Sequence, residues 1–139
     1  MTDRSNELIS LIFATKRRML EKFRQDSYKI TPSMLQLETL RFVQEKQQPL
    51  MKEVAEFLCI TPPSATSLIN DLVEDGMILR LTSENDRRSI RITITQKGEG
   101  VLENGIKQIS QSMAKNIAKL NQDEQEQLIL ILNKFNQIN

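Results

Sequence analysis

The order of segments between residues 61 and 95 constrains the fold of this chain more than any other feature. Residues 61–76 begin with Thr-Pro-Pro and end with Gly, the N-cap, first turn and stop signal of a complete α-helix. Two β-rich runs follow at 77–82 and 90–95, and the second alternates strictly between isoleucine and polar residues. Between them we expect a polar loop over 83–89, longer than a tight turn and therefore able to project. The order predicts a helix followed by a β-hairpin with a charged tip.

A second helix signal lies just upstream of this helix. Residues 50–58 predict a short helix with Val54, Ala55 and Leu58 turned inward, and residues 59–61 form its turn. Two helices joined by such a turn make a helix-turn-helix, whose second helix enters the major groove of DNA. The hairpin then makes the unit a winged helix-turn-helix. An ordinary solvated face remains the alternative for the polar side of the second helix.

The flanking regions predict longer helices. Apolar residues over 5–25 cover more than one stripe of a helix. Thr31 and Pro32 are expected to cap and begin a second helix that ends near residues 47–49. A further cap is expected at Asn121. Apolar residues on either side of it recur at steps of three and four: Leu102, Ile106, Ile109, Met113, Ile117 and Leu120, then Leu128, Ile131, Leu132, Phe135 and Ile138.

These terminal helices carry more apolar surface than a small winged domain can cover. Burial against a second copy would give a twofold dimer, which suits a pseudo-palindromic DNA site; the alternative is packing on their own domain. The sequence therefore predicts a mainly α fold with a small β wing (α+β). We expect one domain over 1–139, with a winged helix-turn-helix DNA-binding region over 31–98 and dimerisation helices over 1–28 and 99–139.

Composition narrows the classes of function. The chain has no histidine and one cysteine, Cys59, so it lacks the commonest general base and metal ligand and can form no internal disulfide. It also shows no nucleophile constellation or phosphate-binding glycine loop. We therefore expect no enzyme, no metal and no cofactor. The absence of a membrane-length apolar run or a signal-type segment predicts a cytoplasmic protein that does not enter membranes.

Positive charge is concentrated near the expected hairpin. The whole chain has a net charge of only +1, whereas residues 80–97 contain five basic and two acidic residues. A local surplus of this kind favours DNA contact by the hairpin, although a surface ion pair is the alternative for any single arginine. A second basic run at residues 16–18 is interpreted as a solvated helix face.

Two motifs complete the pattern, the run Asp86-Arg87-Arg88-Ser89 and the run Thr95-Gln96-Lys97-Gly98. Together with the helix signals over 50–76, they resemble the MarR family of bacterial transcriptional regulators. The resemblance implies a homodimeric DNA-binding regulator, more often a repressor, that is released by a small-molecule effector. A winged-helix module that binds protein and not DNA is the competing class.

The resemblance also implies roles for individual residues. Arg88 corresponds to the wing arginine that enters the minor groove, Asp86 to the acid that fixes the wing, and Arg87 and Ser89 to its phosphate-side neighbours. The expected DNA-binding residues are Pro63, Ser64, Thr66, Ser67, Asn70, Arg80, Asp86, Arg87, Arg88 and Ser89.

The chain departs from the family pattern at two positions on the second helix of the motif. Many members have arginine where this chain has Ser67, and an Asp-Arg pair where it has Asn70-Asp71. Losing one bidentate arginine removes roughly 1–3 kcal/mol of guanine discrimination. The operator sequence of other members is therefore not transferable.

The effector is implied by the family alone. Oxidant-sensing members use a cysteine near the start of the first helix, whereas we expect Cys59 to be a small buried core residue. Zinc-sensing members use histidines, which this chain lacks. An aromatic or phenolic ligand is the remaining expectation. Candidate lining residues are Met19, Phe23, Tyr28 and Met34.

Overall fold

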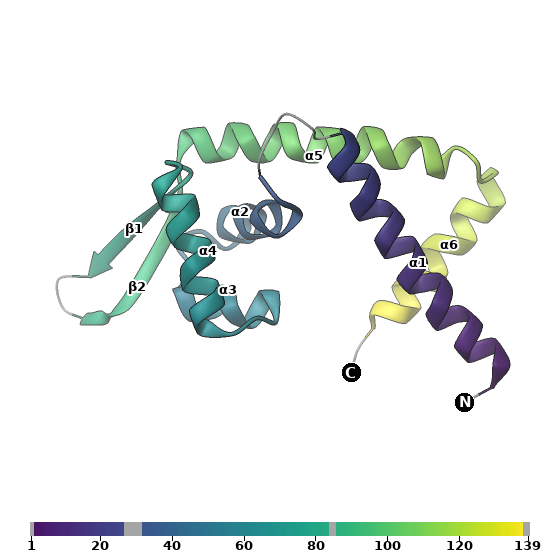
Figure 1. The fold of residues 1–139 in the computed structure, drawn as a ribbon, viewed down its shortest axis with the longest axis horizontal. Helices are drawn as coiled ribbons and strands as arrows, with labels where there is room; N and C mark the ends of the chain where they lie inside the picture. Colours follow the sequence, from purple (N-terminus) through teal and green to yellow (C-terminus); the bar gives the residue numbers. More distant parts are fainter. Residues whose placement is uncertain (1, 27–31, 84–85, 138–139) are drawn as a thin grey trace. The chain divides into compact units, whose positions relative to one another are not determined.

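The computed structural model describes residues 2–26, 32–83 and 86–137. Over these residues the chain forms helices and one antiparallel hairpin in the order α1, α2, α3, α4, β1, β2, α5, α6 (Figure 1). The bounds are α1 Asp3–Asp26, α2 Met34–Lys46, α3 Met51–Leu58, α4 Pro62–Glu74, β1 Ile78–Ser83, β2 Asp86–Ile94, α5 Gln96–Ile117 and α6 Gln122–Asn136. The predicted fold class, mainly α with a small β wing, is confirmed.

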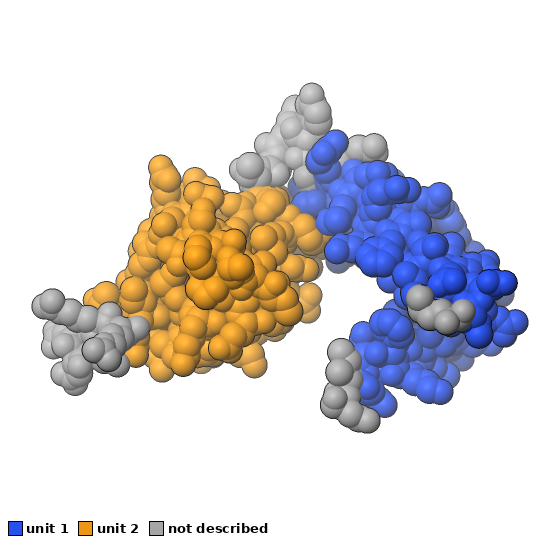
Figure 2. All heavy atoms as spheres, turned by 60° about the horizontal axis from the view of Figure 1, so that its bottom comes forward, with its two compact units in different colours: residues 1–28, 108–139 blue, residues 29–107 orange. Residues whose placement is uncertain are grey.

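The chain divides into two compact units, coloured separately in Figure 2. One contains residues 29–107, hereafter the winged unit, and the other contains residues 1–28 and 108–139, hereafter the terminal unit. The division falls inside α5, so the first half of that helix belongs to the winged unit. Leu102 is accordingly 2% exposed in the core of the winged unit, and its expected place on a dimer-forming face is wrong.

Every element of the winged unit contributes to one apolar core. Its fully buried side chains include Leu40 and Val43 of α2, Val54 of α3, Ile69 and Leu72 of α4, Ile78 of β1 and Ile92 of β2. Burial of each such side chain contributes about 1.5–3 kcal/mol relative to its exposure. The helices and the hairpin therefore hold one another in place, and the faces that remain exposed are presented rigidly.

The hairpin is longer and its connection shorter than the sequence predicted. From Ile78 opposite Ile94 the two strands pair regularly up to Thr82 opposite Ile90, and Ser83 then pairs with Asp86. The expected loop over 83–89 is therefore wrong, because residues 86–89 belong to β2. Residues 87–89 lie between the last two pairs with no counterpart on β1, an irregularity of the kind that bends a strand.

The N-terminus of α2 also differs from expectation. Ser33 is the N-cap, since its hydroxyl accepts from the Gln36 backbone N–H while Gln36 Oε1 accepts from the Ser33 N–H. This reciprocal capping box satisfies two donors that the helix itself leaves unpaired. Pro32 lies before the cap and not at the first helical position, and Thr31 lies outside the described residues. The caps expected at Thr61 and Asn121 are both confirmed.

The terminal unit leaves much of its apolar surface exposed. α6 buries none of its residues, and its exposed side chains include Leu130, Ile131 and Phe135. On α1, Leu8, Leu11 and Phe13 are likewise more than half exposed. One hydrogen bond of 3.3 Å from Lys22 Nζ to the Ser112 carbonyl joins α1 to α5. Ile138 lies outside the described residues.

Within the described part of the chain, no helix combines the length and the apolar character needed to span a bilayer.

Gly98 allows α5 to begin in close contact with the end of α4. A Cβ at this position would collide with the Met77 carbonyl oxygen and lie 2.8 Å from Ile94 Cγ1. We expect Gly98→Ala to lower the free energy of unfolding by about 2–3 kcal/mol, because the obstacle is partly backbone and cannot move aside. Urea denaturation measures this difference.

Gly100→Ala serves as the matched control on the same helix turn. A Cβ there meets nothing within 4 Å, so the exchange should stabilise α5 by roughly 0.5–1 kcal/mol. Equal effects of the two substitutions would show that close packing at Gly98 is not what the site requires.

Candidate nucleic-acid interface

Helix α4 presents a polar face to solvent and an apolar face to the core. Ala65, Ile69 and Leu72 are buried, as the spacing of apolar residues predicted. The opposite side carries the predicted contact residues Pro63, Thr66, Ser67 and Asn70, all of which are exposed. The apolar face of α4 packs against the core, and the small polar side chains on its opposite face permit close approach to base edges in a major groove.

The start of α4 is held by its own hydroxyl groups. Thr61 Oγ1 accepts from the Ser64 backbone N–H at 3.3 Å and donates to Ser64 Oγ at 2.9 Å. Thr66 Oγ1 donates to the Pro62 carbonyl at 3.0 Å. The Ser64 hydroxyl proton is thus available to an acceptor outside the helix, whereas the Thr66 proton is turned back onto the backbone.

The turn between α3 and α4 depends on a left-handed residue at Cys59. Its φ of 54° reverses the chain, and its backbone N–H closes α3 onto Ala55 and Glu56. Left-handed geometry places the side chain outward, and Cys59 is exposed. The expectation of a buried core cysteine is therefore wrong.

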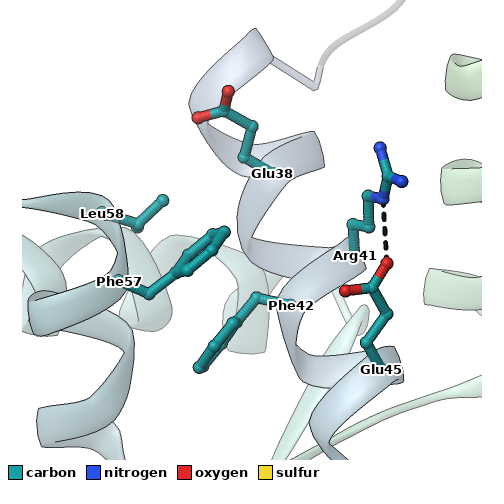
Figure 3. A pocket seen from close by; sticks show the side chains of 6 residues that line it. All are labelled: Glu38, Arg41, Phe42, Glu45, Phe57 and Leu58. Atoms are coloured by element: carbon teal, nitrogen blue, oxygen red, sulfur yellow. Dashed lines mark hydrogen bonds and ion pairs between the residues drawn. The ribbon is translucent and has the colours of Figure 1, made fainter. Parts of the chain in front are cut away.

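An aromatic pair fixes α3 against α2. The Phe42 and Phe57 rings stack with centroids 4.4 Å apart and planes inclined by 18° (Figure 3). Beside them, Glu38, Arg41, Glu45 and Leu58 complete a pocket of about 360 Å³, and Arg41 Nε donates to Glu45 Oε1 at 3.0 Å along α2. Phe42 is buried and Phe57 is 54% exposed, so the pair covers one side of the first helix of the motif. No local sequence pattern predicted this contact.

The end of α4 is tied directly to the start of α5. Gly76, with φ of 75°, ends α4 in a Schellman arrangement in which its N–H donates to the Val73 carbonyl and the Met77 N–H to the Leu72 carbonyl. Thr95 Oγ1 donates to the Gly76 carbonyl at 2.6 Å and accepts from the Gly98 N–H at 3.0 Å.

Lys97 reinforces the same junction. Its Nζ donates to the Asp75 carbonyl at 2.6 Å, placing a cation at the negative end of the α4 dipole. The run Thr95-Gln96-Lys97-Gly98, recognised only as a motif, therefore anchors the second helix of the helix-turn-helix to the strand that leaves the wing.

The basic residues of the hairpin are individually fixed. Arg91 Nη1 donates to the Gln48 carbonyl at 2.9 Å, which ties β2 to the turn before α3. Arg80 Nη2 donates to Asn70 Oδ1 on α4. Hydrogen bonds to neutral acceptors leave the cationic charge in place, so Arg80, Arg91 and Lys97 each remain positively charged on the winged unit.

The predicted wing residues are placed by their backbone. Asp86, Arg87 and Arg88 lie at the start of β2, and their side chains fall outside the described part of the structure. Ser89 is half-buried and, with Leu50, Met51, Lys52 and Ile90, lines a pocket of about 330 Å³. Of the predicted contact residues with described side chains, the structure brings together Asn70 with Arg80, a pairing that local sequence patterns did not reveal.

Residues 33–90, which run from the N-cap of α2 into β2, match the model of the MarR family. Over this stretch, which contains the helix-turn-helix and most of the wing, the chain is similar to the MarR family. The homoprotocatechuate degradative operon repressor of Escherichia coli is 27% identical over 96 residues, which are 69% of this chain and 65% of that protein. The match thus spans slightly less than two thirds of that relative.

Solved structures of the MarR family share the fold. A mutant form of Escherichia coli MarR complexed with operator DNA superimposes with a TM-score of 0.79 at 20% identity, covering 97% of this chain and 99% of that one. Bordetella bronchiseptica BpsR, whose DNA binding is regulated by 6-hydroxynicotinic acid, gives a TM-score of 0.80 at 18% identity, with 93% and 98% covered.

Thr95→Val tests the junction between α4 and α5. The exchange keeps side-chain volume but removes the hydrogen bonds to Gly76 and Gly98, so the free energy of unfolding should fall by about 1–3 kcal/mol. Thr93→Val is the matched control, since Thr93 lies near the end of β2, makes no side-chain hydrogen bond within the described residues and is half-buried like Thr95. Chemical denaturation measures the free energy of unfolding of both variants. An equal loss in both would mean that the Thr95 hydroxyl does not support the junction.

Proposed function

We propose that this protein is a sequence-specific transcriptional regulator, a repressor that binds a pseudo-palindromic operator as a homodimer. The observation that carries the proposal is the exposed polar face of α4, fixed at both ends and adjacent to a hairpin whose basic side chains remain charged. A helix held in this way fits a B-DNA major groove, and the hairpin reaches the neighbouring backbone and minor groove.

The proposed contacts divide into base readers and backbone contacts. Pro63, Ser64, Thr66 and Ser67 on α4 face the major groove. Arg88 enters the minor groove, where a narrow, electronegative channel attracts a guanidinium. Arg87 and Ser89 face phosphates, and Asp86 holds the wing. With a net charge of +1 for the whole chain, affinity must come from these local cations and not from general attraction to a polyanion.

The relatives support the choice of a regulator over other roles. The Escherichia coli relative is an operon repressor, and the MarR structure holds operator DNA. The proposed role is binding and not catalysis, and the place of action is the cytoplasm, where the chromosome lies. The match to the repressor covers 65% of its length, so target and effector specificity are this chain's own.

Dimerisation is proposed from the terminal unit. Leu128, Ile129, Leu130, Ile131, Leu132 and Phe135 are 40–69% exposed along α6. An apolar surface of this extent on one helix is typical of an obligate interface and unfavourable in water. A second copy covers it and supplies the twofold symmetry that a palindromic operator requires.

A small aromatic or phenolic effector is proposed to release the DNA. BpsR, which shares the fold, is regulated by 6-hydroxynicotinic acid, an aromatic acid. Of the expected lining residues, Met19 and Phe23 lie on α1 and Met34 lies on α2, each with some exposed surface, and their part in binding stays a prediction. Tyr28 lies outside the described residues.

DNA binding is tested by fluorescence anisotropy. Labelled duplex from the intergenic region upstream of the gene is titrated with protein at several salt concentrations, beside a scrambled duplex. We expect tighter binding to the native duplex and a steep loss of affinity with salt. Arg88→Ala should weaken binding by about tenfold or more, because it removes a charge-assisted groove contact.

Arg41→Ala is the control for the loss of one positive charge. Arg41 is exposed on α2, paired with Glu45 and not among the expected DNA-binding residues, so its removal should leave DNA affinity nearly unchanged. Weak binding that ignores both sequence and salt would reject the regulator and favour a winged helix that binds protein.

The dimer interface is tested on α6. Ile131→Lys combined with Phe135→Lys places two charges on one exposed apolar stripe and should shift the protein from dimer to monomer at micromolar concentration. Asn133→Lys combined with Asn136→Lys adds the same charge at two exposed positions that are already polar and should leave the dimer intact. Sedimentation equilibrium measures both. A dimer that survives the first pair would place the interface elsewhere.

A further inference from the structure

One hydrogen bond joins the recognition helix to the wing. Arg80 Nη2 on β1 donates to Asn70 Oδ1 on α4, and both residues are exposed. Asn70 and Arg80 were each predicted, separately, to contact DNA. The structure makes them one group, ten residues apart in the chain.

The backbone on each side of this bond is rigid. Asn70 follows Ile69, which is fully buried, and the Cα of Arg80 lies opposite that of the buried Ile92 in the hairpin register. The sheet therefore fixes the backbone of Arg80, and the hydrogen bond to Asn70 on α4 fixes its guanidinium. A long side chain fixed at both ends loses little further conformational entropy when it binds a ligand.

The acceptor in this bond is neutral. The ion pairs among the described residues join Arg17 to Glu21 and Arg41 to Glu45, and none involves Arg80. A carboxylate at position 70 would cancel the charge of Arg80, whereas an amide orients the guanidinium and leaves its charge intact. One of five N–H donors is engaged, so the others remain for an anion.

We propose that Arg80 binds a phosphate of the DNA backbone where the strand passes between α4 and the wing, and that Asn70 is its positioning residue and not a base reader. The proposal rests on the proposed DNA-binding function and deepens it. Asn70 directs its oxygen to Arg80, so its contribution to binding passes through that side chain. Arg80 makes a sequence-independent contact that sets how deeply α4 is seated in the groove.

A double-mutant cycle separates positioning from direct contact. Arg80→Ala should weaken binding to the native and the scrambled duplex alike, by about tenfold, and should reduce the slope of log affinity against log salt by about 0.9, the value for one phosphate. Asn70→Ala alone should weaken DNA binding by about threefold to tenfold. Added to Arg80→Ala, it should leave the affinity for DNA unchanged, because the side chain that Asn70 orients is then absent.

Asn70→Asp tests the role of neutrality. It retains an oxygen acceptor for Arg80 but introduces the charge that an amide avoids, so it should bind more weakly than Asn70→Ala. Arg41→Ala again controls for the loss of one positive charge, and thermal unfolding of every variant confirms that the winged unit is folded.

The possible outcomes separate this proposal from the DNA-binding function on which it rests. Wild-type protein that binds neither duplex in a salt-dependent way overturns the regulator itself, and this proposal with it. Wild-type protein that binds normally, together with an unchanged salt slope in Arg80→Ala, overturns the phosphate contact alone. Additive effects of Asn70→Ala and Arg80→Ala overturn the positioning role and return Asn70 to direct base contact.

Discussion

The hydrogen bonds at the end of α4 are the constraint on which the winged unit depends. Thr95 Oγ1 accepts from the Gly98 N–H and donates to the Gly76 carbonyl, while Lys97 Nζ donates to the Asp75 carbonyl. Three elements meet there: the end of the recognition helix, the strand leaving the wing and the start of α5. Because one set of contacts fixes all three, α4 and the hairpin form one surface and not two independent parts.

On the winged unit, the positions of the positive charges matter more than their number. Arg91 and Lys97 donate to backbone carbonyls and Arg80 to a side-chain amide, so each cation is oriented by a neutral partner. A chain with a net charge of +1 gains little from long-range attraction to DNA. Fixed cations on the winged unit provide affinity at the correct register without binding every polyanion, which is the balance that the proposed sequence-specific regulator needs.

Local signals in the sequence predicted most of the fold, and interactions between distant residues account for what they missed. The cap at Thr61, the stop at Gly76 and the alternation over 90–95 each depend on neighbours in the chain, and each prediction was confirmed. The length of the wing strands, the exposure of Cys59 and the burial of Leu102 depend on pairing register, turn geometry and packing in the core of the winged unit. The Asn70–Arg80 bond depends on how α4 lies beside β1, which no local pattern records.

Hydrogen–deuterium exchange with and without the upstream duplex tests most directly whether α4 and the hairpin act as one DNA-reading surface. DNA should slow exchange together in the peptides that cover the first turns of α4, over residues 62–70, and in those that cover β1 and β2. Peptides from α6 should show no change on DNA addition, because its apolar surface is assigned to the partner subunit. Protection confined to the terminal helices, or protection of the hairpin without α4, would contradict the account.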